Sequence, residues 1–142
     1  MLVIRPLLAL ALLVLLSGVV SGPVQAAEES GPLFLNMTSD EPHRAAMAIG
    51  YGRNQLGRGH ALTLFLNDRG VMIASQAKAG EFAEQQAMIR DIMAKGGVVL
   101  ACPTCMKRYG VAAADLMPGV GQSTPDMTGA ALFAPGARAL SW

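Results

Sequence analysis

The sequence predicts an α/β domain with a mostly parallel sheet, because short apolar runs alternate along it with helical patterns. Three runs have the composition of buried strands: Leu33–Met37, Ala61–Leu66 and Gly97–Ala101. Two helical patterns, over 42–56 and 81–95, separate them. Strands and helices in this order are typical of parallel strands joined by helical crossovers.

Both long helices have recognisable boundaries. Thr38-Ser39-Asp40, followed by Glu41-Pro42, is typical of a helix cap and first turn, and Gly57 ends the first pattern. The second helix ends at Gly96-Gly97, and its apolar residues lie on one stripe: Phe82, Ile89, Ile92 and Met93. Each helix therefore offers one face to a sheet.

Smaller elements are expected in the rest of the chain. A short helix behind the third strand should end at Gly110. It is followed by a turn, a short strand, a helix and a closing strand, over 112–116, 120–123, 126–133 and 138–142. For 71–74 two alternatives stay open, a continuation of the second strand or a loop packed over the core.

Residues 1–26 have the pattern of a signal peptide. A short segment with the single cation Arg5 precedes an uncharged run over 7–20, and Val24-Gln25-Ala26 supplies small residues for cleavage. An uncleaved N-terminal anchor is the alternative. We expect a periplasmic or secreted protein whose single domain covers 27–142 and has no membrane partner after cleavage.

The charge balance indicates no polyanionic partner. The chain has 11 basic and 10 acidic residues, and removal of the signal takes one basic residue away. A near-neutral domain lacks the basic surface that nucleic acid or an anionic membrane requires. Both classes of partner are therefore excluded from the expected function.

The only two cysteines form the motif Cys102-Pro103-Thr104-Cys105 behind the third strand. Pro103 suits the first position of a helix, which makes Cys102 the N-cap. Free backbone N–H groups near its sulfur are expected to lower the thiol pKa and favour the reactive thiolate. A structural disulfide or a pair of buried thiols is the alternative, although a bridge across so short a loop contributes little through loop entropy.

Polar residues are expected to share one edge of the sheet with this motif. In parallel sheets, ligands bind beyond the carboxyl ends of the strands. Those ends are followed here by Ser39, by Asn67 and Asp68, and by Cys102. We predict Cys102 and Cys105 as catalytic residues and the other three as substrate-binding residues, with turn capping as the alternative for Asn67 and Asp68.

These segments resemble the DsrE/DsrF-like family, which includes YchN-type and TusD-type sulfur-relay proteins. The similarity lies in four segments: Leu33–Met37, Phe65–Val71, Val99–Val111 and the closing segment 139–142. In the third segment, Cys102 comes eight residues before Gly110, which is the spacing of family members that carry sulfur. It implies a small three-layer sandwich with a flavodoxin-like arrangement, assembled into trimers or hexamers. It also implies that Cys102 accepts sulfur as a cysteine persulfide and passes it on. The implied partner is a sulfur donor or acceptor protein or a small sulfane-sulfur compound.

Three alternatives to a sulfur carrier or sulfurtransferase remain. A dithiol–disulfide redox protein uses the same two cysteines, although a thioredoxin fold is disfavoured because the motif comes late and its helix is short. A Cu(I) site would use Cys102, Cys105 and a thioether from Met106 or Met37. The third is a non-enzymatic oligomer that binds a ligand. We expect no cofactor and no metal, since only two histidines accompany the cysteines.

Overall fold

The computed structural model describes residues 31–142. The predicted signal peptide over 1–26 lies outside the described residues. Within 31–142 no helix is long and apolar enough to cross a membrane.

Five parallel strands form one sheet in the order β4-β3-β2-β1-β5. This confirms the predicted α/β class and its parallel sheet. The strands are β1 (Leu33–Met37), β2 (Leu62–Leu66), β3 (Val98–Ala101), β4 (Gly121–Gln122) and β5 (Arg138–Ser141).

The helices connect consecutive strands and lie close to the predicted ranges. The α-helices are α1 (Pro42–Gly57), α2 (Ala83–Ala94), α3 (Pro103–Tyr109) and α4 (Pro125–Leu132). Three short 3₁₀ helices accompany them, η1 (Asp68–Ala74), η2 (Gln76–Lys78) and η3 (Ala113–Asp115). The ambiguous segment 71–74 belongs to η1, which packs over the core with Val71 and Ile73 fully buried.

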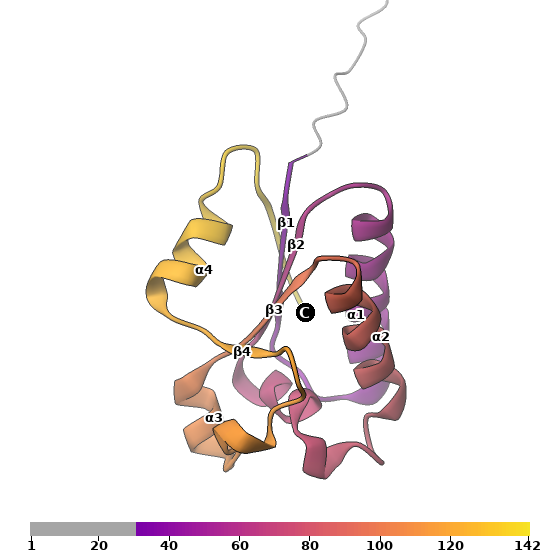
Figure 1. Cartoon of the computed structure of the whole chain (residues 1–142), viewed down its shortest axis with the longest axis vertical. Coiled ribbons are helices and arrows are strands. Elements are labelled where there is room, and N and C mark those ends of the chain that lie inside the picture. Colours follow the sequence, from indigo (N-terminus) through magenta and orange to yellow (C-terminus); the bar gives the residue numbers. More distant parts are fainter. Residues whose placement is uncertain (1–30) are drawn as a thin grey trace, which may run out of the picture.

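The sheet separates two unequal layers of helix (Figure 1). Helices α1 and α2 cover one face, where alternate strand residues such as Leu35 and Leu64 are fully buried. Gly52 allows α1 to lie close to the sheet, because a Cβ there would be 3.0 Å from a Leu35 methyl group. Helix α4 stands alone on the other face, and none of its residues is buried.

Buried polar side chains were not predicted from the helical pattern. Gln86 of α2 is 3% exposed, and its amide donates to the carbonyl oxygens of Ile73 at 3.0 Å and Ser75 at 2.8 Å. Gln85 donates to the carbonyl of Pro42 at 2.7 Å. These two amides tie α2 to the end of η1 and to the start of α1, which both lie at the carboxyl edge of the sheet.

Candidate functional site

The register of the sheet brings three strand ends to the same level. Met37 of β1 pairs with Leu66 of β2, and Leu66 pairs with Ala101 of β3. The next residues continue the pairing, since the Cys102 N–H donates to the carbonyl of Leu66 at 2.9 Å and the Asn67 N–H donates to Met37 at 2.8 Å. Cys102 and Asn67 therefore leave the sheet side by side.

Cys102 is the N-cap of α3, as predicted. Pro103 occupies the first turn, and Cys102 Sγ accepts the backbone N–H of Cys105 at 3.4 Å. The helix ends at Gly110, whose φ of 73° lies in the left-handed region that favours glycine. Both ends of this short helix are thus fixed by local sequence.

The two sulfur atoms lie within reach of each other. Cys102 and Cys105 are free thiols, both half-buried, and their Sγ atoms are 2.9 Å apart. A disulfide bond is roughly 2.05 Å long, so the pair needs only a small movement to close. The arrangement suits both a thiolate stabilised by a neighbouring thiol and a dithiol that oxidises reversibly.

Asn67 contacts the second thiol. Its Oδ1 accepts the Cys105 S–H with a sulfur–oxygen distance of 3.0 Å, and it also accepts the Asp68 N–H at 2.8 Å. Burial, followed by the hydrogen bond to Cys102, raises the pKa of the Cys105 thiol, and the nearby Asp68 charge acts in the same direction. Burial and these neighbours therefore favour the protonated form of Cys105.

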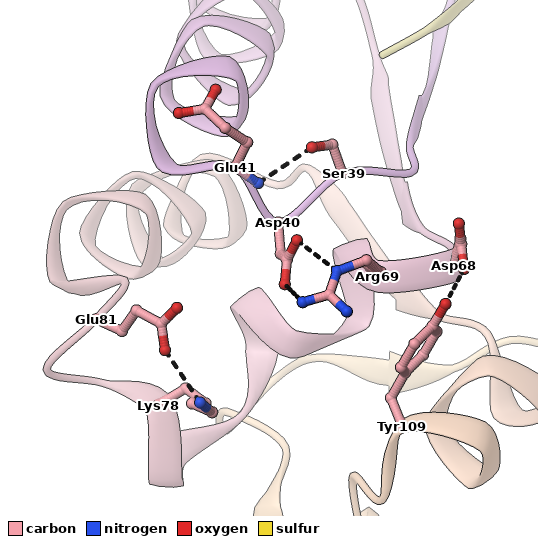
Figure 2. Close-up of polar contacts among 8 residues, drawn as sticks. All are labelled: Ser39, Asp40, Glu41, Asp68, Arg69, Lys78, Glu81 and Tyr109. Atoms are coloured by element: carbon pink, nitrogen blue, oxygen red, sulfur yellow. Dashed lines mark hydrogen bonds and ion pairs between the residues drawn. The ribbon is translucent and has the colours of Figure 1, made fainter.

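Asp68 follows Asn67, the residue that contacts the Cys105 thiol, and its carboxylate binds Tyr109. Figure 2 shows the Tyr109 phenol, which comes from α3, donating to the Asp68 carboxylate at the start of η1. The carboxylate raises the pKa of Tyr109, because it stabilises the protonated phenol. Asp68 has a φ of 46°, the only positive value at a non-glycine residue within 31–142. Strained backbone of this kind clusters at functional sites.

Arg69 links the same turn to the start of α1. Its guanidinium binds both carboxylate oxygens of Asp40, at 2.8 and 2.6 Å (Figure 2). That hydrogen bonding to Arg69 holds the pKa of Asp40 below its usual range. Arg69 also lies 5.7 Å from the centre of the Tyr109 ring, so one network connects α1, η1 and α3.

Ser39, predicted as a substrate-binding residue, contacts the start of α1 in the structure. Its hydroxyl accepts the backbone N–H of Glu41 at 3.1 Å (Figure 2). Asn67, Cys102 and Cys105 contact one another without it. Glu41 in turn caps α1, accepting the N–H groups of His43 and Arg44. Ser39 therefore helps to organise the beginning of α1.

No group of three or more His, Cys, Asp or Glu side chains gathers within residues 31–142 in a way that would hold a metal ion. The thioethers considered for copper belong to Met37 and Met106, which are 0% and 3% exposed and pack in the hydrophobic core. His43 is exposed in the first turn of α1, and His60 contacts the carbonyl of Gly31 at 3.2 Å.

Tyr109 and Arg69 are site residues that the sequence analysis did not identify. Tyr109 follows Cys105 by four positions, which places both on one face of α3. That spacing was a usable signal for Tyr109. Arg69 has no such signal, because its partner Asp40 lies 29 residues earlier in the chain.

The fold and the site together define a small α/β protein with a dithiol at the carboxyl edge of a parallel sheet. A sequence model of the DsrE/DsrF-like family matches residues 33–132, a range that includes both cysteines. The chain therefore belongs to the DsrE/DsrF-like family, a family of the sulfur-relay type.

Solved structures share this fold at low sequence identity. The YchN protein from E. coli has a TM-score of 0.66 and 18% identity, covering 79% of this chain and 98% of its own. MTH1491, a protein of unknown function from Methanobacterium thermoautotrophicum, gives 0.59 and 16%, with 78% and 98% covered. BT1422 from Bacteroides thetaiotaomicron, also of unknown function, gives 0.56 and 20%, with 80% and 95% covered. None of the curated proteins matches the chain.

Proposed function

We propose that this protein is an exported sulfur carrier or sulfurtransferase that holds sulfane sulfur as a persulfide on Cys102. The observation that carries the proposal is the placement of the Cys102 sulfur at the start of α3. There it accepts the Cys105 N–H at 3.4 Å and lies 2.9 Å from the Cys105 thiol. The Cys105 N–H is aimed at the Cys102 sulfur, and the Cys105 S–H is a second donor when it turns from Asn67 Oδ1 to Cys102 Sγ. Both contacts stabilise a thiolate, which is the nucleophilic form.

Loading is a transfer of one sulfur atom. The Cys102 thiolate attacks the terminal sulfur of a donor R–S–SH, a new S–S bond forms on Cys102, and R–S⁻ leaves. The proton stays with the transferred sulfur, so the product is Cys102–S–SH. No net oxidation occurs in this step.

Release has two routes, and Cys105 decides between them. An acceptor thiolate that attacks the terminal sulfur takes the persulfide away and restores the Cys102 thiolate. Alternatively, Cys105 loses its proton and attacks Cys102 Sγ, which gives the Cys102–Cys105 disulfide and hydrosulfide. In the second route the two cysteines are oxidised and the sulfane sulfur is reduced, so a dithiol reductant must reset the protein.

The donor or acceptor in this proposal is a partner protein or a small sulfane-sulfur compound outside the cytosol. This part rests on the signal pattern over 1–26. N-terminal sequencing of the protein recovered from an expressing cell tests it. Processing after Ala26 with recovery outside the cytosol supports export, and an intact Met1 in the cytosolic fraction contradicts it.

Intact-mass spectrometry tests the persulfide directly. The reduced protein is treated with inorganic polysulfide, and the mass is read before and after a second reduction. Read at early times, before Cys105 displaces hydrosulfide, the wild-type protein should gain one reducible sulfur atom, and Cys102→Ser should gain none. Cys105→Ser should accumulate the persulfide, because it lacks the thiol that displaces it. Equal loading of the wild type and Cys102→Ser would contradict the proposal.

Dithiol–disulfide exchange is the second candidate, favoured by the short distance between the sulfur atoms. It predicts that both cysteines are needed equally and that no sulfur is retained in Cys105→Ser. The same mass experiment therefore separates the two functions, since only a carrier gains mass when Cys105 is replaced.

A further inference from the structure

A pocket of about 400 Å³ lies between α4 and the less covered face of the sheet. Its walls include Phe34 and Phe65 of the sheet, Leu132 of α4 and Leu140 of β5, with amide and hydroxyl groups among them. No charged side chain lines it. A concave, mostly apolar pocket of this size with a few polar groups suits a small organic molecule without charge.

Asn36 supplies an unused hydrogen-bond acceptor in the lining of this pocket. Its Nδ2 donates to the Ser141 hydroxyl at 3.1 Å, whereas its Oδ1 is buried and has no partner among the described residues. Buried carbonyl oxygens are rarely left unpaired, because the lost hydration is unfavourable. The lining therefore favours an occupant that brings an N–H or O–H donor.

Asn67 connects the pocket to the thiols. It lines the pocket, and its Oδ1 accepts the Cys105 S–H at 3.0 Å. Asn67 follows Phe65 by two positions, which is the spacing that keeps both on one face of a strand. The side chain of Asn67 thus lies between the polar end of the pocket and the dithiol. Within the dithiol, the Sγ atoms of Cys105 and Cys102 are 2.9 Å apart.

We propose that this pocket binds the organic part of a small sulfane-sulfur donor, an uncharged apolar group that carries an N–H or O–H, and presents its sulfur to Cys102. The proposal rests on the persulfide function of Cys102 and adds the chemical class of its substrate. The reaction is the loading step above, in which the Cys102 thiolate takes the terminal sulfur from R–S–SH and R–S⁻ leaves.

Two donors with the same reactive group test the selectivity. One is the hydropersulfide of N-benzyl-2-mercaptoacetamide, which is apolar and has an amide N–H, and the other is glutathione hydropersulfide, whose carbon skeleton is charged. Initial loading rates at Cys102 are read by intact mass. The apolar donor should load about tenfold faster, which corresponds to the contribution of one buried contact or hydrogen bond.

Ala139→Phe fills the pocket, because Ala139 lines it from the edge strand β5. In this variant the ratio of the two loading rates should fall towards one. Ala130→Phe is the matched control, since Ala130 is exposed on α4 and does not line the pocket, so it should keep the wild-type ratio. An unchanged ratio of loading rates in Ala139→Phe would overturn the proposal. A variant that keeps the wild-type ratio but changes its oligomeric mass would also overturn it, and would identify a second copy of the chain as the occupant of the pocket.

The ester analogue tests the donor requirement. The hydropersulfide of benzyl 2-mercaptoacetate lacks the N–H, so the wild type should load it several-fold more slowly than the amide. Asn36→Leu should abolish this difference. An ester that loads as fast as the amide on the wild type contradicts the role of Asn36.

A binding measurement separates this proposal from the function on which it rests. N-benzylacetamide, which carries no sulfur, is titrated into Cys102→Ser and followed by NMR at the amides of Asn36 and Phe65. Chemical-shift changes at these amides support binding in the pocket. If they occur while no donor loads sulfur onto the wild type, the persulfide function is overturned and the pocket is kept. Normal loading by both donors at equal rates, with no shifts, overturns the pocket alone.

Discussion

Asn67 has a contact in the structure that the sequence did not predict, in addition to the turn capping that it did. The turn sequence predicted a substrate-binding group or a self-capping turn residue. In the structure its Oδ1 caps the start of η1 through the Asp68 N–H and also accepts the Cys105 thiol. One oxygen thus sets both the conformation of the turn and the proton position in the dithiol.

Asn67→Ala should make Cys105 more reactive. A hydrogen bond from a thiol favours its protonated form, so removal of the acceptor should lower the Cys105 pKa. Alkylation of Cys105 by iodoacetamide, located by peptide mass mapping, should then begin at lower pH than in the wild type. The other groups that face Cys105 are Cys102, the Asp68 carboxylate and the Asp68 N–H, and of these the N–H loses its contact with the Asn67 amide in this variant.

Asn67→Asp is the matched control for that experiment. It keeps an oxygen acceptor at the same place and adds a negative charge, which disfavours both thiolates. Alkylation of both cysteines should therefore begin at higher pH. If the two substitutions shift the profiles in the same direction, Asn67 acts only through the shape of the turn.

At the scale of single elements, α3 depends on a glycine that the sequence marked as its end. Gly110 has a φ of 73°, and its substitution by alanine should destabilise the protein by about 1–2 kcal/mol. Urea denaturation measures the difference in the free energy of unfolding. Gly57→Ala is the control, because Gly57 ends α1 with open space around it and should be neutral or slightly stabilising. Equal losses in the two variants would contradict the account.

The contact between α2 and η1 depends on the buried amide of Gln86. Gln86→Leu leaves the Ile73 carbonyl without its donor and removes one of the two donors to the Ser75 carbonyl, which keeps the Lys78 N–H at 3.0 Å, at a cost of about 1–3 kcal/mol. Urea denaturation of this variant and of Gln76→Leu provides the comparison, because Gln76 is exposed and donates to the Leu116 carbonyl at 3.0 Å in a less buried position. We expect the larger loss in the free energy of unfolding for Gln86→Leu. A smaller loss for Gln86→Leu than for Gln76→Leu would show that the carbonyls that Gln86 binds find other partners.

The elements themselves were largely predictable, because their signals are local. The apolar run Leu33–Met37 predicted a buried strand, and every residue of it except Asn36 is buried. Pro103 and Gly110 delimit α3 through their own backbone preferences. The burial of Gln86 was not predictable, since a polar residue on a helix normally faces water. Its burial depends on two carbonyls of a 3₁₀ segment whose path has no periodic signal.

The site was predictable only where the parallel register decides it. Cys102 and Asn67 had to come together, since both directly follow paired strand ends. The contact between Tyr109 and Asp68 joins residues 41 positions apart, and it depends on a positive φ at Asp68 that the sequence does not indicate. Sequence patterns therefore located the thiols and left their neighbours to be found in the structure.

At the scale of the whole molecule, the two faces of the sheet are covered unequally. Helices α1 and α2 bury one face, whereas α4 alone lies over the other (Figure 1). Large apolar side chains remain in contact with solvent on the single chain, among them Phe133 at 82% exposed and Val98 at 47%. Such exposure is typical of surfaces that associate.

We therefore keep the expectation of a homo-oligomer and predict that Phe133→Asp weakens it. Because Phe133 is so exposed in the single chain, the substitution should leave the fold of the monomer intact. Light scattering coupled to size-exclusion chromatography should show a smaller mass for Phe133→Asp than for the wild type. A wild type that runs as a monomer at micromolar concentration would contradict the expectation.

The double contact of Asn67 has a consequence for the energetics of the molecule. Oxidation of the dithiol removes the S–H that Asn67 accepts, so the same amide that lines the pocket differs between the reduced and the oxidised protein. Any molecule that binds one of these two forms more tightly shifts the reduction potential of the cysteine pair, and the two effects are equal by thermodynamic linkage. A molecule that hydrogen-bonds to Asn67 in the pocket is therefore expected to shift the reduction potential of the two thiols.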